Sequence, residues 1–289
     1  MTIAITGATG HLGRLVIDEL LKHTNAEEVV ALARDTTKAA DLASRGVEVR
    51  LFDYDQPQTL APALVGADRL LLVSGNAIGQ RVPQHAAVIE AAKVAGVPFV
   101  AYTSVLHADT AETLAVVPEH VETERLLADA HFTVALLRNG WYSENLVEVA
   151  KQAADSGFLL TSAGGGLQFT ASRADFAAAA AAVLTAETAR ATTYELAGDT
   201  GFTQDEFARM VSELTGKPVT VNHVSYQEHR AALTEASLPQ GLVDFLVSTD
   251  QAISEGELAD PDPGTLSRLI GRPTTPLRDT LAKVVVTSG

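Results

Sequence analysis

Residues 3–13 read Ile-Ala-Ile-Thr-Gly-Ala-Thr-Gly-His-Leu-Gly, and this stretch decides the fold. A short apolar run leads directly into three glycines spaced three residues apart, and an amphipathic helical pattern follows to about residue 22. Gly7 allows a tight turn from strand to helix, Gly10 lets the backbone approach a ligand, and Gly13 lets the helix pack against the strand. The stretch therefore predicts a strand–turn–helix unit of the kind that binds phosphate groups.

The glycine spacing differs by one residue from the G-x-G-x-x-G fingerprint of dinucleotide-binding folds. The position between an apolar strand and an amphipathic helix gives the triplet its meaning, because the first N–H groups of that helix and its dipole attract an anion. We expect a dinucleotide pyrophosphate to bind there. The residues predicted to contact it are Gly7, Thr9, Gly10, His11, Leu12 and Gly13.

A second apolar run, residues 29–33, ends at Arg34, about twenty residues beyond Gly13. In this architecture an acidic residue at that place binds the ribose 2′-hydroxyl, whereas the planar fork of an arginine suits a 2′-phosphate. We therefore predict NADPH as the cofactor, with NADH bound more weakly. Two alternatives stay open: Arg34 is a solvated side chain at a strand end, and Lys38 either assists Arg34 or covers the helix surface.

Six apolar runs alternate with helical patterns over the first half of the chain. Because these runs lack polar alternation, we expect strands that are buried on both faces. The predicted strands are 3–6, 29–33, 47–52, 70–74, 99–103 and 134–137, and the predicted helices are 11–22, 37–44, 59–65, 80–95 and 119–130. The fold class is therefore α/β, a Rossmann-like doubly wound parallel sheet.

The usual strand order brings the carboxyl ends of the first, fourth and fifth strands together, where the strand order reverses. We expect the crevice there to hold the cofactor. The residues that follow or end these strands, and that we predict to contact it, are Ser74, Gly75, Asn76 and Thr103.

The alternation becomes irregular beyond about residue 150. We predict an NADP(H)-binding Rossmann domain over 1–150 and a smaller substrate-binding α/β lobe over 151–289, with room for some of its strands to return to the main sheet. The glycine run 164–166 predicts a hairpin or loop, and Asp175 is placed as the cap of an alanine-rich helix. Thr203 and Glu206 form a capping-box pattern at residue 204. Later helices are expected near 226–233, 241–248 and 276–285.

The composition narrows the classes of function. A formal net charge of −15 and the lack of a basic stripe argue against nucleic-acid binding. Zero cysteines exclude disulfides, thiolate catalysis and cysteine-based metal sites, and we predict no metal. No apolar run approaches the roughly twenty residues that span a bilayer, and the first strand begins at Thr2, so we expect a cytoplasmic protein without membrane contact.

Short-chain dehydrogenases place Tyr-x-x-x-Lys on the helix after the fifth strand, where the lysine lowers the tyrosine pKa for proton transfer. The matching positions here are His120 and Glu124. Alcohol–ketone chemistry by that dyad is therefore not expected. The two residues lie one helical turn apart, which favours a surface pair, although a remnant of the dyad near the cofactor is an alternative.

Three stretches carry a family resemblance: residues 6–13, residues 102–104 (Tyr-Thr-Ser) and residues 137–145 (Leu-Arg-Asn-Gly-Trp-Tyr-Ser-Glu-Asn). They resemble the NmrA-like branch of atypical short-chain dehydrogenases, and within it the bacterial flavin-free NAD(P)H:quinone oxidoreductases of the second type. The likeness extends over nearly the whole length, including residues 104–109, 194–199 and 269–275. The resemblance implies NADPH binding and two-electron reduction of a small-molecule quinone.

A quinone is a good hydride acceptor, so positioning and one or two hydrogen-bond donors replace the missing dyad. Candidate donors near the ends of the fifth and sixth strands are Asn139, Tyr142, Tyr102 and His107, and Asn139, Gly140 and Trp141 are predicted cofactor contacts. A structural role is the alternative for four of these residues: Asn139 in an ordinary Asn-Gly turn, His107 as a solvated histidine, Tyr102 packed at the strand end and Trp141 packed in the core.

Two other functions remain open at this point. The first is a non-catalytic NADP(H)-binding redox sensor or regulator of the NmrA type. The second is an isomerase, epimerase or reductase of another electrophile on the same cofactor platform, since the fold does not decide the substrate. A homo-oligomer is expected only because self-association is common among enzymes.

Overall fold

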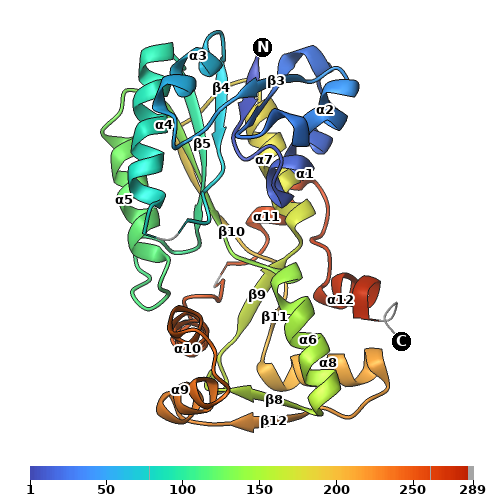
Figure 1. Ribbon diagram of the computed structural model, residues 1–289. Helices are drawn as coiled ribbons and strands as arrows, with labels where there is room; N and C mark the ends of the chain where they lie inside the picture. The colour runs from blue at the N-terminus through green and yellow to red at the C-terminus, as the bar shows by residue number, and fades with distance from the viewer. Residues whose placement is uncertain (78, 261, 286–289) are drawn as a thin grey trace. The chain divides into compact units, whose positions relative to one another are not determined.

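The computed structural model describes residues 1–77, 79–260 and 262–285. The chain divides into two compact units, each of which is described by itself (Figure 1). Unit 1 consists of Met1–Ala108, Pro118–Asn139 and Arg173–Glu195, and unit 2 consists of Asp109–Val117, Gly140–Ser172 and Leu196–Gly289. The units therefore interleave along the chain and do not divide at residue 150.

A seven-stranded sheet in the order β10-β6-β5-β4-β1-β2-β3 forms the centre of unit 1. Strands β1 to β6 run parallel to one another, as predicted. Their bounds are β1 Ile3–Ile5, β2 Val29–Ala33, β3 Glu48–Leu51, β4 Arg69–Leu72, β5 Phe99–Val105 and β6 Thr133–Asn139. The last strand, β10 (Thr192–Leu196), comes from the second half of the chain and adds to the β6 edge.

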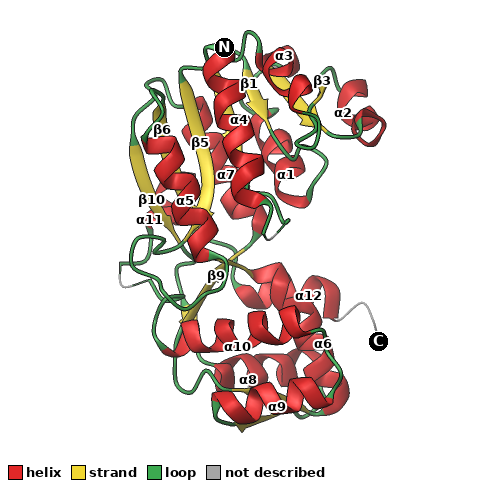
Figure 2. Cartoon of the chain, turned by 60° about the vertical axis from the view of Figure 1, so that its left-hand side comes forward, coloured by secondary structure: helices red, strands yellow, loops and turns green. Residues whose placement is uncertain are grey.

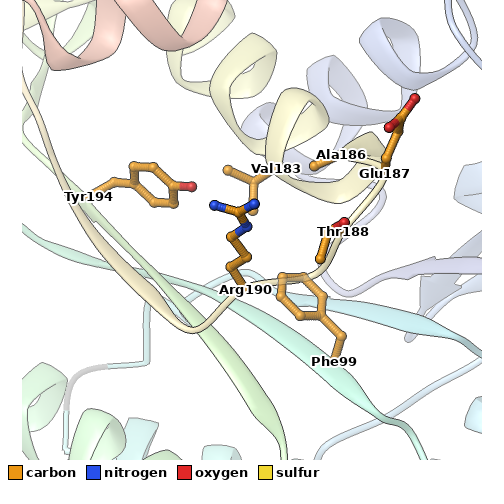
Figure 3. A pocket seen from close by; sticks show the side chains of 7 residues that line it. All are labelled: Phe99, Val183, Ala186, Glu187, Thr188, Arg190 and Tyr194. Atoms are coloured by element: carbon orange, nitrogen blue, oxygen red, sulfur yellow. The ribbon is translucent and has the colours of Figure 1, made fainter.

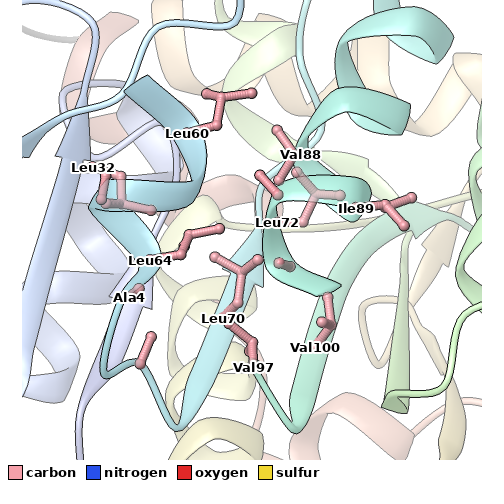
Figure 4. Close-up of a cluster of buried hydrophobic side chains, with 14 of the residues drawn as sticks. Ala4, Leu32, Leu60, Leu64, Leu70, Leu72, Val88, Ile89, Val97 and Val100 are labelled. Atoms are coloured by element: carbon pink, nitrogen blue, oxygen red, sulfur yellow. The ribbon is translucent and has the colours of Figure 1, made fainter. Parts of the chain in front are cut away.

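Helices cover both faces of this sheet (Figure 1). The helices of unit 1 are α1 His11–Leu20, α2 Ala40–Ser44, α3 Leu60–Leu64, α4 Arg81–Ala95, α5 Val117–Ala128 and α7 Arg173–Thr185. Helices α3, α4 and α5 pack against one face through a buried apolar cluster (Figure 4). Helices α1 and α7 contact each other on the opposite face. Because both faces are covered, the strands carry apolar residues without alternation.

Unit 2 consists mainly of helices, which are red in Figure 2. Its helices are α6 Val147–Ser156, α8 Gln204–Thr215, α9 Tyr226–Glu235, α10 Gln240–Ser254, α11 Thr265–Ile270 and α12 Leu277–Val285. Two small sheets accompany them: β7 (Trp141–Tyr142) with β9 (Gln168–Ala171) and β11 (Gly201–Phe202), and β8 (Phe158–Thr161) with β12 (Thr220–His223).

Two local expectations for the second half of the chain differ in part from the structure. Of the hairpin or loop expected at the glycine run, the structure contains the loop, because β8 pairs with β12 and β9 pairs with β7 and β11. Gly166 lies so close to α10 that an added Cβ would come within 2.3 Å of the Ile253 carbonyl oxygen, which ties the run to that helix. Asp175 lies in the first turn of α7 and does not cap it, because the helix already begins at Arg173.

No helix within the described ranges is long and apolar enough to cross a membrane.

Candidate cofactor site

The turn between β1 and α1 has the geometry of a tight phosphate-binding turn. Gly7 adopts a positive φ of 58°, which costs a residue with a side chain about 1–2 kcal/mol. A Cβ on Gly13 would lie 2.3 Å from the Gly7 carbonyl oxygen, so the helix packs against the turn itself. Hydrogen bonds from Gly10 N–H to Gly7 O at 2.8 Å and from Ala8 N–H to Leu32 O at 3.3 Å hold the turn in place.

The start of α1 is open to a ligand. Gly10 is the N-cap, makes no side-chain cap, and is followed by no acidic residue in the first turn. The first hydrogen bond of the helix runs from Arg14 N–H to Gly10 O at 3.1 Å, so the N–H groups of His11, Leu12 and Gly13 have no acceptor within the helix. These donors and the positive end of the helix dipole are suited to a pyrophosphate.

Two threonine hydroxyls tie the neighbouring strand ends together. Thr6 Oγ1 accepts a hydrogen bond from Val73 N–H at 2.9 Å, and Thr103 Oγ1 accepts one from Ser74 N–H at 2.8 Å. Both threonines are buried. Thr103 therefore holds the loop after β4, and Thr6 holds the same loop from the end of β1. Thr6 was not among the site residues predicted from the sequence, although its position at the end of the first apolar run could have indicated this role.

Arg34 follows β2 directly, and its side chain is exposed. It has no hydrogen-bond or ion-pair partner in the part of the chain that the structure describes. The adjacent carboxylate does not neutralise it, because Asp35 accepts hydrogen bonds from the backbone and hydroxyl of Thr37. Arg14 differs, since it is paired with Asp41. A permanently charged, uncommitted guanidinium at this place fits a 2′-phosphate.

The side chain of Tyr102 lies in the core of unit 1. The residue is fully buried in the apolar cluster beneath α4 and α5, and its hydroxyl hydrogen-bonds to His120 Nδ1 at 2.8 Å. Burial raises the pKa of the Tyr102 hydroxyl above its usual value and lowers the pKa of His120 to about 3. Both groups are therefore neutral near pH 7 and are held within the core.

The expected surface pair of His120 and Glu124 is wrong. Glu124 binds Arg138 through two bonds of 3.1 and 2.8 Å and accepts a hydrogen bond from the Ser104 hydroxyl. Arg138 also binds Glu195, 2.8 Å away. Helix α5 therefore directs both dyad positions toward the sheet, where His120 meets β5 and Glu124 meets β6.

The backbone of His107 is held by this ionic network. Its N–H donates to Glu195 Oε2 at 2.9 Å, and its φ is +55°, a conformation that non-glycine residues seldom adopt. Nearby, the Leu106 N–H donates to the Asn139 carbonyl at 3.0 Å, which joins the ends of β5 and β6. His107 and Asn139 are thus both anchored at the carboxyl edge of the sheet in unit 1.

The other predicted contacts of this segment lie in unit 2. Gly140 donates to Leu196 O at 2.7 Å, and a Cβ on it would lie 3.0 Å from that same oxygen. Trp141 stacks on the Phe245 ring with 5.9 Å between centroids, which is the packing role expected as an alternative. Tyr142 follows in β7 and is half-buried.

A cavity of about 360 Å³ lies elsewhere in unit 1 (Figure 3). Its lining includes Phe99, the first residue of β5, and Val183 near the end of α7. It therefore lies at the amino ends of the strands, whereas ligands of open α/β sheets bind at the carboxyl ends. The cavity is not the cofactor site.

The model of the NmrA-like family matches residues 1–275. The chain belongs to the NmrA-like family. A curated relative, quinone oxidoreductase 2 of Escherichia coli strain K12, is 47% identical over 280 residues, which cover 97% of each chain. The crystal structure of the NADPH-dependent quinone oxidoreductase 2 of Escherichia coli with NADPH matches 98% of this chain and 99% of its own, with a TM-score of 0.94. The Citrobacter sp. triphenylmethane reductase with NADP(H) is 37% identical, covers 98% of this chain and 100% of its own, and has a TM-score of 0.91.

This NmrA-like protein also contains a Ser–His–Asp cluster in unit 2 that is not a catalytic triad. Ser162 Oγ and Asp250 Oδ2 both approach the same ring nitrogen of His229, Nδ1, at 2.9 and 3.2 Å. A triad needs the serine on one nitrogen and the carboxylate on the other. The cluster instead fastens β8 to α9 and α10. Among the described residues, no three His, Asp or Glu side chains gather as metal ligands would.

Proposed function

We propose that this chain transfers a hydride from NADPH to a quinone, in a two-electron reduction that requires no flavin. The observation that carries the proposal is the open start of α1 with an uncommitted Arg34 nearby in the same unit, in a chain 47% identical to a quinone oxidoreductase. The fold alone does not decide the reaction, so the close relative supplies the substrate class.

The residues of unit 1 fit NADPH. The N–H groups of residues 11–13 lie at the start of α1, where no side chain caps the helix. They are therefore suited to bind the pyrophosphate. Arg34 suits the 2′-phosphate because its guanidinium is charged and exposed. The loop after β4 is held close to β1 and β5 by Thr6 and Thr103, so Ser74, Gly75 and Asn76 have a fixed backbone for contacts with the ribose and nicotinamide.

Because a quinone accepts a hydride readily, the protein has to position the two reactants and supply one or two hydrogen-bond donors. When bound, NADPH supplies the hydride, and one proton then completes the hydroquinone. We assign the stabilisation of the developing negative charge on the quinone oxygen to His107 and Asn139, which both lie at the carboxyl edge of the sheet in unit 1, and Tyr142 stays a candidate from the sequence alone. We assign the accompanying proton transfer to His107, an imidazole whose backbone N–H is held by Glu195 at 2.9 Å.

The direct test follows the loss of nicotinamide absorbance when purified protein is mixed with NADPH and a small benzoquinone or naphthoquinone. A protein-free reaction is the control, and NADH is assayed in parallel. We expect saturable, quinone-dependent turnover that favours NADPH. Tight NADPH binding without turnover on any simple quinone contradicts the proposal and favours a redox sensor.

Substitution of Arg34 tests the choice of cofactor separately. We expect Arg34→Ser to weaken NADPH binding at least about tenfold while leaving NADH binding nearly unchanged, because a charge-assisted contact to phosphate is worth about 1.5–3 kcal/mol. Lys38→Ser in the same assay shows whether a second cation assists. Equal losses for both nucleotides, measured by quenching of the reduced nicotinamide fluorescence, would mean that the phosphate is bound elsewhere.

A further inference from the structure

The backbone of the loop between β4 and α4 is held by side chains rather than by secondary structure. Gly75 is held at both of its polar backbone groups. Its N–H donates to His85 Nε2 at 3.1 Å, and its carbonyl accepts from Arg81 Nε at 2.8 Å. Both side chains come from α4, four residues apart, so they lie on one face of that helix. Together they form a clamp on a single residue, which we call the Gly75 clamp.

The clamp is anchored to α5. Arg81 pairs with Glu119 at 3.0 Å, and the same carboxylate accepts the Gly79 N–H at 2.8 Å. His85 Nδ1 lies 3.0 Å from Thr123 Oγ1, whose hydroxyl donates to the Glu119 carbonyl at 2.8 Å. Helices α4 and α5 therefore fix the loop jointly, and the clamp does not depend on α4 alone.

These contacts define the protonation state of His85. Nε2 faces an N–H donor, so it carries no proton, and the single ring proton must lie on Nδ1 and point to Thr123. The ring is fully buried and stacks edge-to-face on Tyr102, with 5.6 Å between centroids. Burial and the neighbouring Arg81 lower the pKa of His85 to about 3. A neutral ring with one fixed tautomer is a rigid acceptor for the Gly75 amide.

We propose that His85 is a positioning residue for the cofactor: it holds Gly75, and with it Ser74 and Asn76, in the backbone conformation that binds NADPH. The inference rests on the proposed function for the identity of the cofactor. His85 itself lies in the core and touches no reacting atom. Its effect passes through one hydrogen bond to a backbone amide, which a conservative substitution can remove or restore.

Two substitutions of His85 separate this bond from simple packing. Glutamine places its side-chain oxygen near the position of Nε2, so His85→Gln keeps the acceptor for Gly75. Asparagine is shorter and reaches only the position of Nδ1, so His85→Asn loses it. His131→Asn is the matched control, because that histidine is exposed. Circular dichroism and thermal unfolding of each variant establish that it is folded.

Hydrogen–deuterium exchange of residues 73–77 without cofactor gives the first readout. We expect exchange to rise about tenfold in His85→Asn and to stay near wild type in His85→Gln and His131→Asn, because one backbone hydrogen bond is lost. The second readout is kinetic. In His85→Asn the Kd and KM for NADPH should rise about tenfold with the KM for the quinone unchanged, and His85→Gln should restore most of the loss.

The outcomes are distinguishable. Unchanged exchange in His85→Asn overturns the clamp. Faster exchange with unchanged NADPH affinity overturns its role in cofactor binding. If wild-type protein binds no NADPH, the proposed function fails together with that role, while the exchange data still decide whether His85 orders the loop. Equal losses in the Gln and Asn variants assign His85 to packing alone and overturn the proposal.

Discussion

Helices α1 and α8 begin in opposite ways. Helix α8 starts with a complete capping box, in which Thr203 accepts the Glu206 N–H at 3.3 Å and Glu206 accepts the Thr203 N–H at 2.9 Å, with acidic residues in its first turn. Helix α1 starts with a glycine, no side-chain cap and no acid. Both bury an apolar stripe, so packing stabilises both.

The difference shows which helix start serves stability and which serves a ligand. A side-chain cap contributes about 0.5–2 kcal/mol, and α8 takes that contribution from its own residues. Helix α1 forgoes it and leaves its first N–H groups to an anion. A helix whose start is uncapped while its body is well packed is therefore a strong indication of a phosphate site, provided that a tight glycine turn precedes it.

The largest effect should come from Gly13→Ala. A Cβ there meets the backbone of Gly7 at 2.3 Å, so the turn must shift and carry its N–H donors away. We expect a loss of about 1–3 kcal/mol in the free energy of unfolding and a fall of about 100-fold in NADPH affinity. Gly241→Ala is the control, since nothing lies within 4 Å of its added Cβ. Near-wild-type affinity of Gly13→Ala for NADPH would show that this turn does not bind the cofactor.

The second-largest effect should be a loss of stability at acidic pH, because two buried histidines must be protonated when the chain unfolds. The pKa values of His85 and His120 are lowered to about 3, by burial first and by the nearby Arg81 second. The unfolded chain therefore binds more protons between about pH 6.5 and pH 3, so the stability is present above pH 6.5 and is lost as the pH falls. The charged or titratable groups around the two rings are Arg81, Tyr102, Glu119 and Glu124.

Between pH 7 and pH 5.5, above the usual range of carboxyl titration, we expect each ring to cost about 1 kcal/mol in the free energy of unfolding. Urea unfolding at the two pH values measures the loss. His85→Gln should remove about half of it, and His131→Asn should leave it unchanged. A pH dependence that is the same in wild type and His85→Gln would show that His85 is not buried as a neutral ring.

A smaller effect, with opposite signs for stability and binding, is expected from His11→Glu. A negative charge at the first exposed position of α1 interacts favourably with the helix dipole and should stabilise the cofactor-free protein by about 0.3–1 kcal/mol. The same charge repels a pyrophosphate, so NADPH affinity should fall about tenfold. Thermal unfolding and fluorescence titration measure the two quantities. A change of the same sign in both would argue against an anion at this helix start.

The smallest effect on the cofactor should come from Thr203→Ala. Loss of the α8 cap should lower the free energy of unfolding by about 1 kcal/mol and leave NADPH affinity unchanged. Glu206→Gln keeps the side-chain oxygen of the box and should cost less. Weakened NADPH binding in Thr203→Ala would show that the capped start of α8 also contributes to the cofactor site. The contrast between a helix start that serves stability and one that serves a ligand would then be wrong.

Much of unit 1 could be predicted from the sequence because its signals are local. Apolar runs placed the six parallel strands within a few residues of their observed bounds, and the Thr203–Glu206 pattern predicted its capping box. At the glycine run the sequence left a hairpin and a loop open, because strand pairing there depends on residues far along the chain, in β12 and β11. Nothing in a local pattern distinguishes two strands that neighbour each other in sequence from two that pair.

For the polar residues at the carboxyl edge of the sheet, too, local sequence patterns do not identify the partners. The sequence by itself determined the glycine turn, the uncapped start of α1 and the arginine after β2, since each depends on residues a few positions apart. Only the tertiary structure decided that Tyr102 pairs with His120, that Glu124 pairs with Arg138, and that His85 holds Gly75. These partners come from different elements, and a polar side chain shows no sign in the sequence of whether a ligand or the core will satisfy it.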